Sequence, residues 1–579
     1  MNYRTKLLVR ILCPSLKPRR AKVVGMSSFP TDVEIANNHQ LEPIAEIARK
    51  AQIPAEALIP YGEKKAKIDT SKLDWSRKDG KLVLVTGVSP TPAGEGKSTT
   101  LIGLTDALAH AGKNAMVAIR EPSLGPVMGI KGGAAGGGYS QIVPMDEINL
   151  HFNGDFHAIT SANNTLAALI DNHIHQGNDL AIDPRRVTWQ RCEDVNDRSL
   201  RSVVTGLGGP GNGSPRESGF TITAASEIMA IVGLSTDLAD LRRRLGDITV
   251  GYTYDKQPVT ARELGADGAL TVLLKDALQP NLVQTLGGVP ALVHTGPFGN
   301  IAHGCNSVLA TKVALNQADI VLTEAGFGSD LGAEKFFDIK ARHAGLNVDA
   351  AVVVATIRSL KFNGGVAKTD LEESNVDALS AGVANLEQHV NNIRQFGVTP
   401  VVALNIFGSD SPAEIDFMHD WAQKFGVELA ESTVFANGGA GAKDLADKVL
   451  AHLDGQSTTL YDPSKGVEDS IATIASKVYG ASNVEYSVSA RKDLDYLREC
   501  GWDQLPVCIS KTQYSFSDDP SRLGAPKGHT LHVRKLLPRT GAGFILALTG
   551  DVMTMPGLPK RPAAEAIDIT DDGVISGLS

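Results

Sequence analysis

The chain has 579 residues, of which 42% are hydrophobic and 21% are charged, which is the composition of a soluble globular protein. At about 150 residues per domain, this length predicts roughly three or four domains. The net charge is −9, and residues 1–25 carry seven Lys or Arg and no acid, so the rest of the chain is more acidic still. The acidic charge of residues 26–579 argues against nucleic acid as a partner. No stretch of the sequence approaches the roughly 20 apolar residues that a membrane helix needs. Five cysteines without a C-x-x-C pair argue against a zinc finger or a disulfide framework and favour a reduced compartment.

The first 25 residues differ in composition from everything after them. Arg10 interrupts their apolar part and no small-residue cleavage site follows, which argues against a secretory signal. The basic, acid-free composition resembles an organelle transit peptide but is poor in serine. We interpret residues 1–25 as a disordered extension, or as the product of an upstream start codon with Met26 as the true start.

After Met26, strand-like and helix-like segments alternate. Residues 81–88 and 114–122 are short apolar runs typical of strands, and residues 98–113 between them have helical spacing. Further alternation of strand and helix appears at 351–360, 398–407 and 427–435. This pattern predicts an α/β protein with parallel sheets.

A glycine-rich loop lies between the first predicted strand and helix, in the context that a phosphate-binding P-loop requires. Its backbone N–H groups and the following helix N-terminus would form an anion site. We expect Lys97 to reach the β- and γ-phosphates of ATP and Ser98 to face Mg²⁺. The alternative is a glycine-rich turn that binds nothing. The loop residues are Thr91, which replaces the first glycine of the strict pattern, Pro92, Ala93, Gly94, Glu95, Gly96, Lys97 and Ser98.

A second glycine-rich segment, GIKGGAAGGGY at 129–139, contains six glycines in eleven residues. A structural linker is one interpretation, because glycine loses much entropy on folding and brings no side chain to pack. Lys131 and Tyr139 are unusual in a linker, and HFNGDFHAI follows at 151–159. These residues favour a functional loop.

GIKGGAAGGGY also resembles one signature of the formate–tetrahydrofolate ligase family, and VATIRSLKFNGG at 354–365 resembles the second. The similarity covers about residues 28–579. It continues through TPAGEGKSTT, REPSLGPVMG, IAHGCNS, TEAGFGSDLGAEKFFDIK, KTQYSFSDDP and TGDVMTMPGLPK.

The resemblance implies ATP-dependent ligation of formate to tetrahydrofolate through a formyl-phosphate intermediate, giving 10-formyltetrahydrofolate, ADP and phosphate. Lys97 matches the family's phosphate-loop lysine, and Arg120 matches the arginine assigned to formyl phosphate, whose oxygens a guanidinium fork grips well. Without the family, an ion pair with Glu121 is an equal interpretation of Arg120. Gly299 lies near the segment that approaches adenine in the family, where alanine is usual.

Two phenylalanines match positions that the family uses against the folate. Phe407 matches an aromatic residue, and Phe435 stands where tryptophan is usual. Asn437 stands where lysine is common, and Thr221 stands where aspartate is usual. A phenylalanine at the end of an apolar strand is more often a core residue, so the folate role of both rests on the motif match.

The resemblance also sets expectations for cofactors, assembly and domains. We expect Mg²⁺ to arrive with ATP, no dedicated metal cage, activation by a monovalent cation such as K⁺ or NH4⁺ at a site that the sequence does not locate, and a cytoplasmic homotetramer. We expect a P-loop NTPase-like large domain at 26–390, a smaller α/β domain at 391–465 that contributes to the folate site, and a C-terminal α/β domain at 466–579. The alternative function is that of a P-loop ATPase acting as an assembly or regulatory switch.

Overall fold

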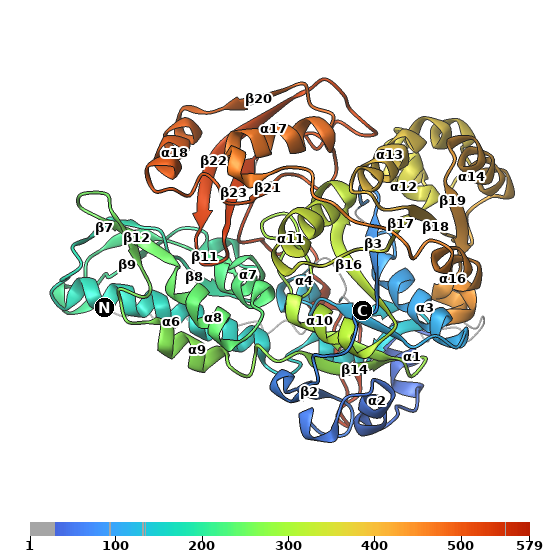
Figure 1. Ribbon diagram of the computed structural model, residues 1–579, viewed down its shortest axis with the longest axis horizontal. Coiled ribbons are helices and arrows are strands. Elements are labelled where there is room, and N and C mark those ends of the chain that lie inside the picture. Colours follow the sequence, from blue (N-terminus) through green and yellow to red (C-terminus); the bar gives the residue numbers. More distant parts are fainter. Residues whose placement is uncertain (1–28, 92–93, 130–132, 134, 551, 579) are drawn as a thin grey trace, which may run out of the picture.

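The computed structural model describes residues 29–91, 94–129, 133, 135–550 and 552–578 (Figure 1). The predicted extension at 1–25, the loop positions Pro92 and Ala93, and Lys131 lie outside the described residues.

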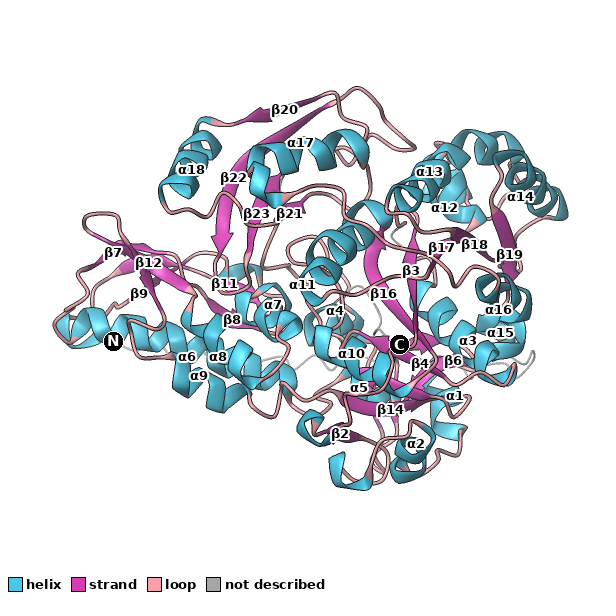
Figure 2. Cartoon of the chain, in the orientation of Figure 1, coloured by secondary structure: helices cyan, strands magenta, loops and turns pink. Residues whose placement is uncertain are grey.

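Among the described residues, a large sheet of 12 strands runs through the protein (Figure 2). The strands β15, β4, β16, β3, β17, β18 and β19 are neighbours in that order and run parallel. The remaining strands form an antiparallel edge beside β15. The parallel strands are β15 Pro290–Val293, β4 Ala115–Ile119, β16 Ile320–Gly328, β3 Lys81–Gly87, β17 Ala350–Ala355, β18 Pro400–Asn405 and β19 Glu428–Ser432, and the edge strands are β1 Leu58–Pro60, β2 Ala66–Ile68, β14 Asn281–Thr285, β5 Gly136–Gly137 and β6 Ser140–Val143.

Helices cover both faces of this sheet, which explains why its strands are continuous apolar runs. Along β3, Leu82 and Leu84 belong to one core cluster while Val83 and Val85 belong to the other, as the two-residue period of a strand requires. The first cluster includes α2 Ile44–Lys50, α10 Val308–Gln317, α12 Ile357–Asn363, α13 Val376–Gln395 and α14 Pro412–Phe425. The second includes α1 Asp32–Asn38, α3 Lys97–His110, α5 Met145–Asn149, α15 Val434–Asn437 and α16 Lys443–Leu450.

The predicted order of strands and helices is confirmed. The run at 81–88 forms β3, residues 98–113 begin and end close to α3, and 114–122 contains β4. At 351–360 the chain passes from β17 to α12, because Thr356 and Ser359 form a reciprocal capping box that starts the helix.

Residues 155–278 form a further layer, on the left of Figure 1, around a hydrophobic cluster that they share with residues such as Val308 of α10 and Phe544 of the C-terminal part. The amphipathic helix α6 is packed beside short helices, and a small sheet in the order β13–β12–β7 lies next to them. The elements are α6 Asp155–His175, α7 Glu227–Leu234, α8 Leu238–Gly246, α9 Asp267–Leu274, β7 Ile182–Val187, β12 Thr249–Thr253 and β13 Pro258–Thr260, with the pairs β8 Arg191–Glu193 and β11 Phe220–Ile222, and β9 Val203–Thr205 and β10 Arg216–Ser218.

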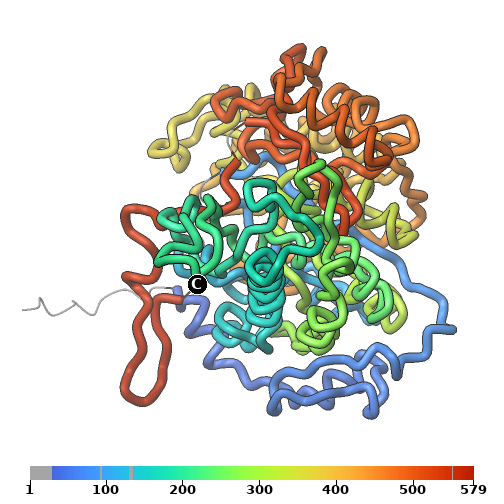
Figure 3. Tube along the Cα trace, turned by 90° about the vertical axis from the view of Figure 1, so that its left-hand side faces the viewer, coloured from blue at the N-terminus to red at the C-terminus, as the bar shows by residue number. Residues whose placement is uncertain are grey.

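The C-terminal part forms a further sheet in the order β20–β22–β23–β21, with its own core. From there the chain returns to the large sheet, where the Ala563 N–H donates to the Gly129 oxygen of the segment after α4 and Leu578 joins the core beside α3. Figure 3 shows this red tail reaching out from the rest of its unit. The elements are β20 Asn483–Tyr486, β21 Val507–Ser510, β22 Thr530–Arg539, β23 Phe544–Thr549, α17 Val467–Lys477, α18 Val488–Glu499, the tail pair β24 Asp568–Ile569 and β25 Ile575–Ser576, and α4 Leu124–Met128.

The expected boundary at residue 390 falls inside α13, and the sheet continues across it. Strands β18 and β19, from the segment 391–465, pair in parallel register with β17 of the P-loop part. The residues of that segment therefore lie on the same sheet as the P-loop.

Within the described part of the chain, no helix combines the length and apolarity that crossing a membrane requires.

Candidate functional site

The predicted site residues follow neighbouring parallel strands of the large sheet. The carboxyl ends of parallel strands lie at one edge, where open α/β sheets bind their ligands. Side chains from six adjacent strands meet this edge. They are Arg120 after β4, Glu324 in β16, the P-loop after β3, Thr356 after β17, Phe407 after β18 and Phe435 on α15 after β19.

The P-loop leads from β3 into α3, which begins at Lys97. Gly94 and Gly96 have φ angles of 78° and 68°, in the left-handed region that favours glycine. A Cβ on Gly96 would lie 2.4 Å from the Nδ2 atom of Asn405, so this glycine also permits close contact with the end of β18. The helix N-terminus behind the loop supplies the N–H groups and partial positive charge of an anion site.

Glu95 stabilises the loop from within. Its carboxylate accepts hydrogen bonds from the Thr91 N–H at 2.7 Å and from the Thr356 hydroxyl at 2.5 Å, and its backbone oxygen accepts from Asn405 at 3.3 Å. The Glu95 side chain therefore connects the loop to the residue after β17, and its backbone connects the loop to the end of β18. We therefore expect Glu95 to contact ATP through its backbone and not through its carboxylate.

Arg120, Lys97 and Ser98 converge on a buried carboxylate, Glu324. The Arg120 Nε lies 3.2 Å from Glu324 Oε1, the Lys97 Nζ lies 3.9 Å from Oε2, and the Ser98 hydroxyl donates to Oε2 at 3.0 Å. The ion pair that Arg120 forms is thus with Glu324, on the adjacent strand, and the alternative pairing with Glu121 is not the one present. This arrangement places two cationic side chains beside the phosphate loop.

The Glu324 side chain is fully buried, between two cationic side chains. Burial by itself raises the pKa of its carboxyl, but the charges of Arg120 and Lys97 outweigh burial and hold the pKa below its usual value. An anionic carboxylate at this position neutralises the two cations that would face phosphate oxygens.

Gly299 packs against Phe327 and Gly326. A Cβ on Gly299 would lie 3.2 Å from the Phe327 Cδ2 atom, and a Cβ on Gly326 would lie 3.1 Å from Arg120 Nη1. Phe327 has a φ angle of 63°, which is uncommon for a bulky residue and is typical of functional segments. The glycine at 299 leaves room for this ring where an alanine methyl group would press on it.

Phe407 follows β18, and the guanidinium of Arg358 lies 3.7 Å from its ring centroid in a cation–π contact. The Phe407 N–H donates to the Asp410 carboxylate at 2.8 Å, which fixes the turn that presents the ring. The ring is half-buried, so it is neither a core residue nor freely solvated.

Phe435 is 44% exposed and lies on the short helix α15. Its backbone oxygen accepts a hydrogen bond from the Tyr139 N–H at 2.8 Å, and a Cβ on Gly138 would lie 2.1 Å from the same oxygen. The described glycines at 136–138 thus form the β5–β6 hairpin and pack against Phe435, so this part of the run is not a linker. Asn437, beyond it, donates to the Thr433 hydroxyl at 3.0 Å.

Three residues of the site were not assigned from the sequence. Glu324 and Phe327 lie in the motif TEAGFGSD, which carried the family resemblance without a role, and Arg358 lies in the second signature. The sequence signal for Glu324 is a glutamate within an apolar strand. Its partners, Ser98 and Arg120, come from segments about 200 residues away, and only the fold brings them together.

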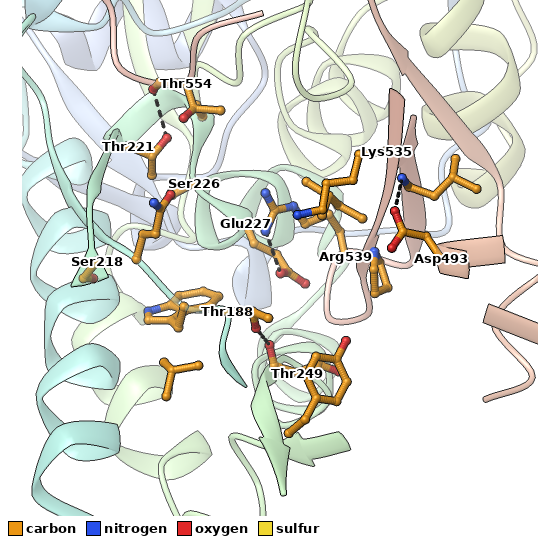
Figure 4. Close-up of a pocket in the computed structure, with 18 of the residues that line it drawn as sticks. Thr188, Ser218, Thr221, Ser226, Glu227, Thr249, Asp493, Lys535, Arg539 and Thr554 are labelled. Carbon is orange, nitrogen blue, oxygen red and sulfur yellow. Dashed lines mark hydrogen bonds and ion pairs between the residues drawn. The ribbon is translucent and has the colours of Figure 1, made fainter. Parts of the chain in front are cut away.

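A separate cavity of about 670 Å³ lies between the 155–278 layer and the C-terminal sheet (Figure 4). Glu227 lines it and accepts hydrogen bonds from the Gly541 and Ala542 N–H groups, and Arg539 lies 3.9 Å from its other oxygen. Thr221 donates to the Thr554 backbone oxygen at its rim. None of the described residues predicted for ATP or folate lines this cavity.

Across the described residues, no group of three or more His, Cys, Asp or Glu side chains is arranged to hold a metal ion. The oxygens suited to a magnesium ion that accompanies ATP are the Ser98 hydroxyl and the Glu324 carboxylate, which already contact each other. Hard oxygen donors are the ligands that Mg²⁺ prefers, so these residues fit that ion.

Comparison with known proteins assigns the chain to a family. The family model described as formate–tetrahydrofolate ligase matches residues 30–579. A formate–tetrahydrofolate ligase of Corynebacterium diphtheriae is 68% identical over 551 residues, covering 95% of this chain and all of that protein. Proteins of the same name from Corynebacterium jeikeium and Staphylococcus aureus are 65% and 58% identical, covering 95% of this chain and 98% and 99% of their own lengths. The chain therefore belongs to the formate–tetrahydrofolate ligase family and is a ligase.

Proposed function

We propose that this protein joins formate to the N10 nitrogen of tetrahydrofolate at the expense of ATP, through a formyl-phosphate intermediate. The observation that carries the proposal is the convergence of Arg120, Lys97 and Ser98 on Glu324 beside a P-loop. The names of the relatives and of the matching family support the substrates formate and tetrahydrofolate.

In the first step, a formate oxygen attacks the γ-phosphorus of ATP, the bond from that phosphorus to the bridging oxygen breaks, and ADP leaves. Formate needs this activation because its carboxylate is a poor electrophile. The loop N–H groups and Lys97 bind the phosphates, and the Arg120 fork holds oxygens of the transferred phosphoryl and formyl groups. These cations favour the transition state, because negative charge is redistributed over those oxygens during transfer.

A magnesium ion bound with ATP would neutralise phosphate charge at this site. Ser98 and Glu324 are the residues that would hold it. In this chain Glu324 also aligns the Arg120 guanidinium, since their ion pair joins the neighbouring strands β4 and β16. Activation by a monovalent cation remains a prediction, and its binding site is not assigned to any residue.

In the second step, the N10 lone pair attacks the formyl carbon, the carbon–oxygen bond to phosphate breaks, and the amine proton is lost to solvent. This step needs the folate ring system beside the formyl phosphate. Phe407 and Phe435 follow β18 and β19, two and three strands away from β3 in the same edge of the sheet. Their partly exposed rings are suited to stacking on a flat heteroaromatic system.

The test measures ADP and 10-formyltetrahydrofolate together. The ligase should release ADP steadily only when formate and tetrahydrofolate are both present, with one product formed per ADP. An ATPase that acts as a regulatory switch would release ADP at the same rate without either substrate, and that result would overturn the proposal. A homotetrameric assembly and a cytoplasmic location are further proposals drawn from the family resemblance; sedimentation and cell fractionation test them.

A further inference from the structure

Three partly exposed aromatic side chains meet beside the proposed folate site. Phe29, Tyr139 and Phe435 are 49%, 44% and 44% exposed. The Phe29 ring stacks on Phe435 with centroids 5.4 Å apart and planes 25° apart, and the Tyr139 ring meets Phe29 edge-on at 5.9 Å and 85°. A contiguous group of exposed aromatic side chains, unlike a single exposed ring, marks a candidate binding surface.

The backbone holds these three rings in one place. Asp32, in the first turn of α1, accepts a hydrogen bond from the Gly138 N–H at 2.8 Å, and its backbone oxygen accepts from the Gln141 side chain at 3.1 Å. Tyr139 in turn donates its N–H to Phe435. Phe29, only three residues before Asp32, is therefore positioned by the same contacts that position Phe435.

The residue at position 435 is a phenylalanine, whose phenyl ring offers less stacking area than the indole that the family resemblance leads us to expect there. Phe29 supplies a second aromatic ring in near-parallel contact with the smaller one. A stacked neighbour limits the rotation of the Phe435 ring, part of whose side chain stays exposed.

We propose that Phe29 is a positioning residue of the folate site, which acts through Phe435 to orient the ring that receives the tetrahydrofolate ring system. The inference rests on the proposed function, because it needs Phe435 to contact the folate. It assigns to the segment before α1 a role in substrate affinity. Arg120, Lys97 and the P-loop, which serve ATP and formyl phosphate, lie on other strands and are not part of this contact.

The first experiment compares Phe29→Ala, Phe29→Leu and Phe29→Tyr by steady-state kinetics at saturating ATP and formate. Loss of one aromatic pair should raise the tetrahydrofolate KM about two- to tenfold in the alanine variant. The leucine variant, which keeps apolar bulk without a π-system, should lie in between, and the tyrosine variant should behave as the parent. The kcat and the ATP KM should not change. Tyr254→Ala is the control, because Tyr254 is an exposed aromatic residue of the 155–278 layer.

The second experiment uses a matched pair of chains that start at Met26 and, with an added methionine, at Pro30. Both lack residues 1–25, but only the first retains Phe29. The shorter chain should show the same rise in tetrahydrofolate KM as Phe29→Ala, and the longer one should not.

Phe435→Ala separates failure of this inference from failure of the proposed function. If Phe435→Ala leaves the tetrahydrofolate KM unchanged, the folate role of Phe435 is wrong and the inference falls with it. If Phe435→Ala raises that KM while Phe29→Ala does not, only the role of Phe29 is wrong. The variant Phe29→Ala/Phe435→Ala should be no worse than Phe435→Ala alone, since Phe29 acts through Phe435. A fall in kcat, a raised ATP KM or a changed oligomeric state in Phe29→Ala would instead indicate a structural or subunit contact and overturn the inference.

Discussion

The Arg120 guanidinium and the Glu324 carboxylate form an ion pair across the neighbouring strands β4 and β16, with Nε and Oε1 3.2 Å apart. Ser98 and Lys97, from the P-loop helix, contact the second oxygen of the same carboxylate. One buried acid therefore links the residues proposed to bind the nucleotide to the residue proposed to meet formyl phosphate. The roles of these residues can be separated by substitution.

Arg120→Ala should separate nucleotide binding from chemistry. In the proposed function the loop amides and Lys97 hold the ATP phosphates, so equilibrium ATP affinity should change little, while formate- and tetrahydrofolate-dependent turnover should fall about 10²-fold or more. Lys97→Ala should instead weaken ATP binding itself. The role assigned to Arg120 is wrong if Arg120→Ala turns over normally, or if it loses ATP affinity as severely as Lys97→Ala.

Glu324→Gln keeps the shape of the side chain and removes its charge. The cations Arg120 and Lys97 would then be less neutralised, so ATP without Mg²⁺ should bind more tightly. Turnover with Mg-ATP should fall about tenfold or more, because a metal ligand and the alignment of Arg120 are both lost. Equilibrium ATP binding in the presence of a chelator and in the presence of Mg²⁺ checks this, with Glu324→Asp as the charge-retaining control. Unchanged affinity in the chelator would show that this carboxylate does not act on the phosphates.

Phe435→Trp should lower the tetrahydrofolate KM modestly, about two- to tenfold, because an indole offers more stacking area. The open part of the Phe435 side chain gives the larger ring room, but Gly138 and Phe29 pack against it, so overpacking is the competing effect. The ATP KM should remain nearly constant. A change confined to the ATP KM would contradict the folate role of Phe435 and indicate that this residue contacts the nucleotide.

Asp106, on α3, should make stability depend on pH. Burial raises the pKa of its carboxyl to about 7, although hydrogen bonds from Thr285 and the Gly287 N–H oppose that rise. A pKa raised by folding contributes stability that is present below the unfolded value and is lost as the pH rises through about 7. Asp106→Asn removes the ionisation and can still accept the Thr285 hydrogen bond. Its melting temperature should match the parent only near or below about pH 4, where an unfolded aspartate is still protonated, and exceed it by about 2 °C or more at pH 8; equal melting temperatures at pH 8 would contradict the assignment.

A chain that starts at Met26 should fold and retain full activity. Residues 1–25 lack the patterning of a core element, and the matching family model begins at residue 30. Solubility, melting temperature and turnover of the shortened chain provide the measurement. Loss of activity or solubility would show that the extension has a role in the folded enzyme.

The sequence by itself predicted the α/β class, the strand–loop–helix around the P-loop and the family. It could do so because these features are local: a buried parallel strand is a continuous apolar run, a P-loop is a contiguous segment, and family signatures are contiguous too. Lys97, Ser98 and Arg120 were predicted as site residues in this way. Glu324, the carboxylate that all three residues contact, was not predicted.

The tertiary structure decided which residues meet. Glu324 reaches Arg120 and Ser98 only because β16 lies between β4 and β3 in the sheet, an order that no local pattern encodes. Likewise, Phe29 stacks on Phe435 from more than 400 residues away in sequence, because α1 and α15 both pack against the glycine hairpin. Strand order and helix docking are set by burial of complementary apolar faces across the whole chain, so the partners of a charged or aromatic side chain become visible only once that packing is known.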